Sequence, residues 1–147
     1  MKISHTLVTM FVGSFLVQYF LMSPIMVNNR LEITNNICKA YLSVIMGFFM
    51  VLLELMMHDH QYHVLSLNLY AIFIAGLVLF VYLYRKQIAI HDKQYVQGMI
   101  EHHSMGILTS EEILKKTDNY DIAKLAKNII QTQKDEIRTM RELLQNK

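Results

Sequence analysis

The sequence predicts an all-α protein in which three transmembrane helices precede an antiparallel helical hairpin. Three observations predict this class. Three long stretches carry almost no charge, the charged residues collect in the last part of the chain, and that part repeats apolar residues with a helical period. The 147 residues are 53% hydrophobic, with a mean hydropathy of +0.26. We therefore divide the chain into a three-span transmembrane domain, residues 1–86, and a soluble helical hairpin, residues 87–147.

The three spans are expected at residues 6–26, 40–57 and 64–84. The first and third contain no formal charge, and the second contains only Glu54, near one end. A helix of about 20 residues crosses the roughly 30 Å hydrocarbon core of a bilayer. For residues 6–26 the alternative is a secretory signal peptide. We favour a retained span, because the apolar run is longer than a usual signal core and lacks an A-x-A-like cleavage site.

Basic residues predict the orientation of the spans. Three spans place the chain ends on opposite sides of the membrane. The N-terminal side holds Lys2, whereas the opposite side holds Arg30, Lys39, Arg85, Lys86 and Lys93. Basic loops favour the cytoplasmic side. We therefore expect a multi-pass integral membrane protein with its N-terminus outside and its hairpin in the cytoplasm.

The hairpin is expected to contain two helices. The first would begin at a cap on Asp92 and end near Lys116, and the second would run from about Tyr120 to Leu144. The residues between them, 117–119, have turn chemistry. The second helix carries an apolar stripe with a period of 3.6 residues. Two such helices bury too little surface alone, so we expect a homo-oligomer that completes a four-helix bundle, or docking on the spans.

A group of sulfur and imidazole donors lies on this hairpin. Met99, His102 and His103 share one helical face, and folding about residue 118 places His103 level with residue 133, within about one turn. Imidazole with thioether suits monovalent copper, and imidazole with carboxylate suits zinc. The candidate metal ligands are His102, His103, Met99 and Met140, with Gln133 and Glu136 orienting the imidazoles. The alternative is a core histidine that is hydrogen-bonded to Gln133 or Glu136.

A second polar group follows the second span. It consists of Glu54, His58, Asp59, His60 and His63, and we expect residues 58–63 to form a short turn. Histidine-rich tracts and ionisable groups inside spans indicate a possible second metal site. The alternative is a set of interfacial polar residues that end a helix.

Other function classes have little support. The net charge of +2, without a basic stripe, predicts no nucleic-acid partner. The lone Cys38 excludes an intramolecular disulfide. Nucleophile and phosphate-binding motifs are absent from the sequence, so we expect no enzyme.

Residues 95–144 resemble domain of unknown function family 305. The family pattern has a G-M-I-x-H-H start and an A-x-x-I-I-x-x-Q-x-x-E-I-x-x-M helix. The matching residues are Met99, His102, His103, Ala126, Ile129, Ile130, Gln133, Glu136, Ile137 and Met140. The resemblance implies a ferritin-like, four-helix-bundle class, a membrane-anchored branch and, for some relatives, bound copper. This sequence departs from the pattern at Glu101, where proline is usual, and at Thr109, where many members carry methionine.

Together these observations predict a membrane-anchored metal-binding protein for copper, or zinc, homeostasis or delivery, with lipid as a partner. One alternative is a non-catalytic membrane scaffold whose hairpin mediates assembly. The other is a small metal permease. A looser likeness to three-span copper-uptake permeases rests on Met46 and Met50 of the second span.

Overall fold

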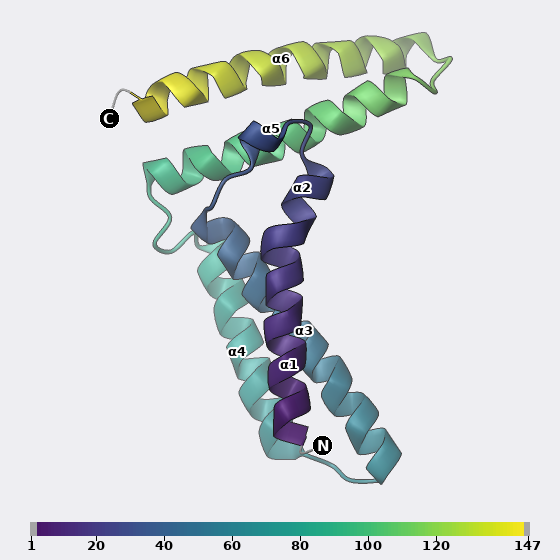
Figure 1. The fold of residues 1–147 in the computed structure, drawn as a ribbon, viewed down its shortest axis with the longest axis vertical. Helices are drawn as coiled ribbons and strands as arrows, with labels where there is room; N and C mark the ends of the chain where they lie inside the picture. Colours follow the sequence, from purple (N-terminus) through teal and green to yellow (C-terminus); the bar gives the residue numbers. More distant parts are fainter. Residues whose placement is uncertain (1–2, 146–147) are drawn as a thin grey trace. The chain divides into compact units, whose positions relative to one another are not determined.

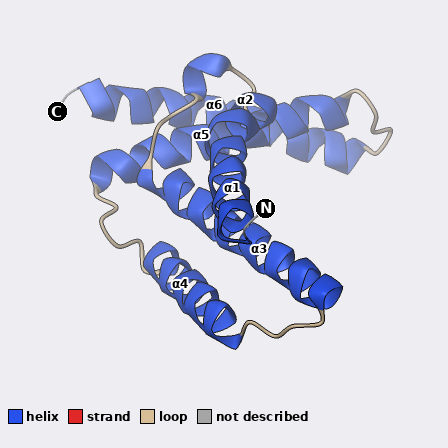
Figure 2. Cartoon of the chain, turned by 60° about the horizontal axis from the view of Figure 1, so that its bottom comes forward, coloured by secondary structure: helices blue, strands red, loops and turns tan. Residues whose placement is uncertain are grey.

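The computed structural model describes residues 3–145, and the regular structure in that range is entirely helical (Figure 2). The all-α class with three long apolar helices is therefore confirmed. The chain forms two compact units. We call the first the membrane unit; it consists of the chain up to Met22 and of Ile37–Ala89. We call the second the hairpin unit; it consists of Ser23–Asn36 and of the chain from Ile90 onward. Lys2, which entered the orientation argument, lies outside the described residues.

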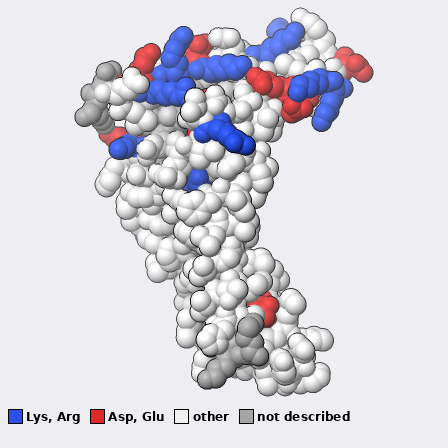
Figure 3. All heavy atoms as spheres, in the orientation of Figure 1, with Lys and Arg blue, Asp and Glu red and all other residues white. Residues whose placement is uncertain are grey.

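Three helices are long and apolar enough to cross a membrane. The first spans Ile3–Met26 and consists of α1 (Ile3–Leu16), a π-helical stretch (Val17–Leu21) and α2 (Met22–Met26); the others are α3 (Ile37–Tyr62) and α4 (Leu67–Arg85). Few charged side chains lie on these helices in the face shown in Figure 3, whereas blue and red side chains cover α5 and α6. The charge division seen in the sequence is therefore also a division between the two units.

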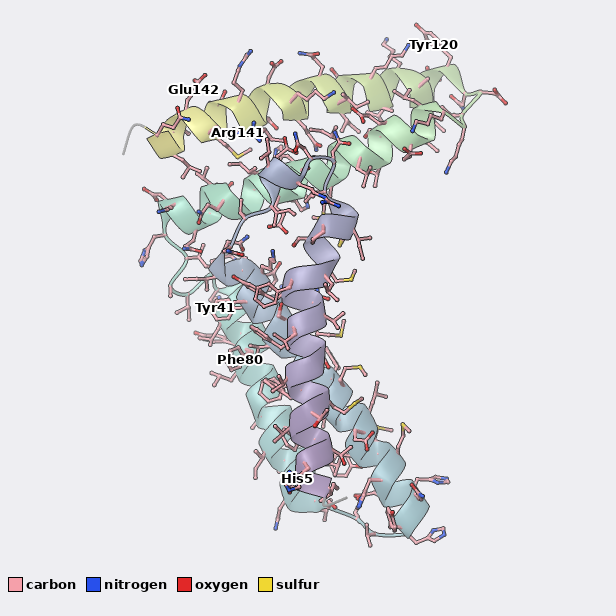
Figure 4. All side chains as sticks on the ribbon, viewed as in Figure 1. His5, Tyr41, Phe80, Tyr120, Arg141 and Glu142 are labelled. Carbon is pink, nitrogen blue, oxygen red and sulfur yellow. The ribbon has the colours of Figure 1, made fainter. Side chains whose placement is uncertain are left out.

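Apolar and aromatic packing holds the membrane unit together. Its buried core contains Leu7, Val51 and Leu55. Gly47 lets α1 approach α3 closely, because a Cβ at Gly47 would lie 2.9 Å from the ring of Phe11. On the other side of α3, Tyr41 packs edge-on against Phe80 of α4, with ring centroids 6.1 Å apart (Figure 4).

The second apolar helix is longer than the sequence predicted. The expected turn at residues 58–63 is wrong in position, because α3 stays helical to Tyr62 and α4 begins at Leu67. The chain reverses after His63, whose φ of 51° lies in the left-handed region. His58 and His60 therefore belong to the last turns of α3.

The hairpin unit contains α5 (Asp92–Leu114) and α6 (Tyr120–Gln145), which run antiparallel (Figure 1). The turn between them lies where the sequence predicted it. Asn119 caps α6, since its Oδ1 accepts hydrogen bonds from the backbone amides of Asp121 at 2.9 Å and Ile122 at 3.2 Å. At the start of α5, His91 occupies the cap position expected for Asp92, and its side chain makes no capping hydrogen bond.

An apolar seam joins α5 to α6. Its buried residues are Ile100, Ile107 and Ile137, and Val96, Ile130, Met140 and Leu144 pack against them. The seam uses one face of α5. Glu101 and Ser104, on another side of α5, are also buried, and they contact the strap, our name for residues 23–36. The strap includes a short 3₁₀ turn, Arg30–Glu32.

Candidate functional site

His103 links the two helices of the hairpin. Its Nδ1 lies 2.8 Å from the carbonyl oxygen of Met99, one turn earlier on α5, and its Nε2 lies 2.8 Å from Oε2 of Glu136 on α6. The His103 side chain is 13% exposed, whereas that of Glu136 is 52% exposed. The imidazole is therefore largely enclosed, and its carboxylate partner reaches it from the solvent side.

The two hydrogen-bond partners fix the roles of the ring atoms. A backbone carbonyl only accepts hydrogen bonds, so Nδ1 carries a proton and donates a hydrogen bond to the carbonyl oxygen of Met99. The Nε2–Glu136 contact then shares one proton, either as imidazolium with carboxylate or as imidazole with carboxylic acid. A histidine whose Nδ1–H is held by a carbonyl directs Nε2 outward, which is how metal-binding histidines are commonly oriented.

Gln133 sets the register of the two helices. A Cβ built on Gly106 would lie 2.3 Å from Oε1 of Gln133, so the carboxamide covers the space that a larger residue would occupy. That oxygen is buried, and no hydrogen-bond partner for it exists among the described residues. Gln133 thus lies level with Gly106, and Glu136 lies level with His103. The sequence placed residue 133 beside His103, which is three residues, or about one helical turn, away from the observed register.

The remaining predicted ligands surround this contact unequally. His102 is exposed, and its ring centroid lies 6.2 Å from that of His103. Met140 packs against the apolar seam, and the observed register places it level with the half-buried Met99. Within residues 3–145, three His, Cys, Asp or Glu side chains do not come together as a metal-binding group. The donors that fit a soft metal ion are imidazole and thioether, with Glu136 already in contact with Nε2.

The second predicted group, in the membrane unit, is divided. The Asp59 carboxylate is buried and accepts hydrogen bonds from the backbone amide of Ser66 at 2.7 Å and from its hydroxyl at 3.0 Å. His58 contacts the same carboxylate, with Nδ1 3.1 Å from Oδ1. His60 and His63 are exposed, and Glu54 is half-buried. Asp59 therefore anchors the turn before α4.

Another buried carboxylate with several hydrogen bonds is one that the sequence noted only as a departure from a family pattern. Glu101 is buried on α5, where it binds the strap at both of its ends. Its Oε1 accepts from the Ser23 hydroxyl, and its Oε2 accepts from the Thr34 amide at 3.2 Å and the Thr34 hydroxyl at 3.0 Å.

Ser104 adds a further hydrogen bond between α5 and the strap. Its hydroxyl, fully buried, accepts from the backbone amide of Asn28 at 2.8 Å. Glu101 and Ser104 are three residues apart and share a helical face that the apolar seam does not use. A polar pair at this spacing on one helical face is a sequence signal for a docked segment, although no prediction above rests on it. Nothing in the pattern identifies which segment docks.

Comparison with known proteins gives two matches. Residues 82–145 match the family described as domain of unknown function (DUF305). The chain is also 32% identical over 136 residues to "Uncharacterized protein L153" of Acanthamoeba polyphaga mimivirus; this alignment covers 92% of the chain and 88% of that protein. No solved structure matches the chain. The family match covers α5 and α6, and the likeness to the viral protein extends well beyond them.

Proposed function

This chain belongs to the family described as domain of unknown function DUF305, and from that premise we propose that it is a membrane-anchored protein that binds a soft metal ion. The observation that carries the proposal is the orientation of His103. Its Nδ1–H is held by the Met99 carbonyl, and its Nε2 faces the Glu136 carboxylate on α6. The proposed metal is copper, with zinc as the alternative, and the role is homeostasis or delivery.

The proposed ligands are His102, His103, Met99 and Met140, with Gln133 and Glu136 in supporting positions. Two features favour this set. Thioether sulfur with imidazole selects monovalent copper over harder ions. Gln133 Oε1 is buried without a hydrogen-bond partner among the described residues, one turn from His103. Binding requires that Nε2 of His103 give up its contact with Glu136, which is half-exposed and can swing into solvent.

The orientation of the chain belongs to the same proposal. We place the N-terminus outside and the hairpin in the cytoplasm, on the distribution of basic residues. A protease that cannot enter intact cells should therefore leave a C-terminal tag uncut. Cleavage of that tag before lysis would show that the C-terminal hairpin lies outside the cell and would contradict the proposed orientation.

Metal titration of the purified full chain in detergent tests the site. Copper(I) and zinc stoichiometries should fall when His102→Ala and His103→Ala are combined. The matched control is His60→Ala with His63→Ala, which removes two exposed imidazoles from the membrane unit and should leave the hairpin stoichiometry unchanged. Unchanged stoichiometry in the first variant would refute the proposed ligand set. A loss only in the second would move the site to the end of α3.

A second candidate function is assembly of a homo-oligomer through the hairpin. The observation that favours it is a set of large apolar side chains left exposed on α5 and α6. These are Tyr95, Ile113, Tyr120, Ile122, Leu125 and Leu143, with exposed fractions from 41% to 76%. Two helices joined only along one seam cannot cover such residues, and pairing two hairpins into a four-helix bundle would.

Leu125→Asp tests the assembly role, because Leu125 is 59% exposed and its loss should leave the hairpin folded. We expect the variant to shift the full chain to a smaller species in size-exclusion chromatography with light scattering. Asn128→Asp, an exposed position on the same helix, adds the same charge and should have no effect. If both variants keep the native mass, the hairpin does not mediate assembly through this surface.

A further inference from the structure

A cavity of about 380 Å³ opens on the hairpin unit, where residues of the strap and of α6 line it. Its lining combines three cations, two carboxylates, one amide and an apolar floor. The lining residues are Glu32, Lys134, Ile137, Arg138, Arg141, Glu142 and Gln145. Arg141 and Glu142 are labelled near the C-terminal end of α6 in Figure 4. The volume suits a small organic group, and neither proposal above uses it.

Glu32, from the strap, supplies the unusual feature of this cavity. It is 8% exposed, and its Oε1 accepts a hydrogen bond from the Arg141 guanidinium at 3.3 Å. Its Oε2 is buried, and no described residue donates to it. A buried carboxylate oxygen without a donor is costly, and Oε2 is closed to solvent, so a ligand that brings an N–H or O–H group favours rotation of the Glu32 carboxylate toward the cavity.

The cations on α6 supply the opposite chemistry. Lys134 binds Glu111 at 3.0 Å and Arg138 binds Asp135 at 3.2 Å, so each is held in place by one carboxylate. A guanidinium has five N–H donors, so Arg138 and Arg141 keep donors beyond these single contacts. Planar donor pairs of this kind match phosphate oxygens. The cavity therefore places an acceptor for a cation beside donors for an anion.

We propose that this cavity binds a phosphoethanolamine group, with the ammonium at the Glu32 carboxylate and the phosphate at Arg138 and Arg141. The chemistry is shared by an ethanolamine phospholipid headgroup and by its free glycerol phosphodiester. The position of Glu32 in the chain favours the lipid. It lies six positions after Met26, the last residue of the first candidate span, and so at most about 20 Å along the chain from the end of that span.

Binding to the purified full chain in detergent tests the proposal. Three soluble short-chain lipids are titrated by calorimetry: phosphatidylethanolamine, phosphatidylcholine and phosphatidylglycerol. The first should bind at least about tenfold tighter, because choline has no N–H donor and glycerol has no cation for Glu32. Equal affinity for all three would overturn the proposal. Glycerophosphoethanolamine as a fourth probe separates the sources, since tight binding identifies the free diester as sufficient and weak binding identifies the lipid.

Variants separate the cavity from general surface charge. Arg138→Gln with Arg141→Gln should weaken phosphatidylethanolamine binding at least about tenfold. Lys124→Gln with Lys127→Gln removes the same charge from exposed positions of α6 outside the cavity and should change it little. An equal loss in both pairs would reduce the effect to nonspecific attraction and contradict the proposal.

Glu32→Gln tests the ammonium end of the site. It should abolish the preference for ethanolamine over glycerol while phosphatidylglycerol still binds, and a retained preference would contradict the assignment. Because Glu32 is buried, this change can also unfold the strap. Arg138→Gln alone, at a side chain that is 72% exposed, keeps the fold and should still weaken binding of all three lipids.

Discussion

Asp59 of the membrane unit and Glu101 of the hairpin unit are both buried carboxylates that hold a connecting segment, but they act over very different lengths of chain. Asp59 binds Ser66, seven residues away, whereas Glu101 binds Thr34 and Ser23, 67 and 78 residues away. A short loop costs little entropy to close, and a long one costs more. Asp59 therefore finishes a local turn, and Glu101 joins segments of its unit that lie far apart in the chain.

The largest effect should follow removal of Glu101, because Ser23 and Thr34, toward the two ends of the strap, lose this shared acceptor at once. Glu101→Ala should lower the free energy of unfolding by about 3 kcal/mol. Hydrogen exchange of the full chain in detergent should show faster exchange throughout residues 23–36. Glu101→Gln keeps one acceptor oxygen and should show a smaller change. Unchanged exchange in the strap would mean that Glu101 does not hold it.

Removal of Asp59 should have a smaller and strictly local effect. In Asp59→Ala the amide and hydroxyl of Ser66 lose their acceptor, so the first turn of α4 should exchange faster. The same exchange experiment should show no change in residues 23–36. A change that spreads into the strap would break the distinction between local and long-range carboxylates.

The His103–Glu136 contact should rank third, because its carboxylate is half-exposed and screened by water. A double-mutant cycle of His103→Gln and Glu136→Gln should give a coupling energy of about 0.5–1 kcal/mol in metal-free protein. Added salt should weaken it. A coupling energy well above about 1 kcal/mol would contradict this ranking, because it would show that solvent exposure does not weaken the contact.

The smallest effect belongs to Glu112 and Lys115, an exposed pair on the last turns of α5. The hydrogen bond from Lys115, and then its charge, lower the pKa of the Glu112 carboxyl, and the same contact raises the pKa of Lys115. The pair therefore stabilises the fold at pH values above the ordinary carboxyl pKa. This stabilisation is lost as pH falls through the lowered Glu112 pKa. At the alkaline end it is lost as pH rises through the raised Lys115 pKa. Glu112→Gln should slightly flatten stability against pH in thermal unfolding, and a variant curve parallel to the native one would contradict this.

Much of the fold followed from local patterns. Uncharged runs predicted the apolar helices, and the turn chemistry around Asn119 predicted the hairpin, because both signals are confined to a few neighbouring residues. The end of α3 was missed, since histidine, aspartate and glutamine are compatible with both a helix end and a turn. The docked strap was missed for another reason. Nothing in the spacing of Ser23 and Thr34 indicates a partner 78 and 67 residues later, respectively.

The candidate site was predictable in its members and less so in its contacts. Met99, His102 and His103 share a face by spacing alone, and Glu136 was named among their neighbours. The exact depth of each side chain depends on the register, which differed by about one turn from the sequence estimate. In the observed register Glu136 contacts His103, and Gln133 lies over Gly106.

The strap has a consequence for the order in which the protein matures. The hairpin unit takes residues 23–36 from early in the chain and Glu101 from much later. During synthesis, Ser23 and Thr34 leave the ribosome long before the helix that binds them exists, and α3 and α4 are made in between. A helix that is translated later is therefore needed to complete a segment that was translated earlier. A ribosome that stalls before α5 would release a chain whose three apolar helices are all present and whose strap has nothing to hold.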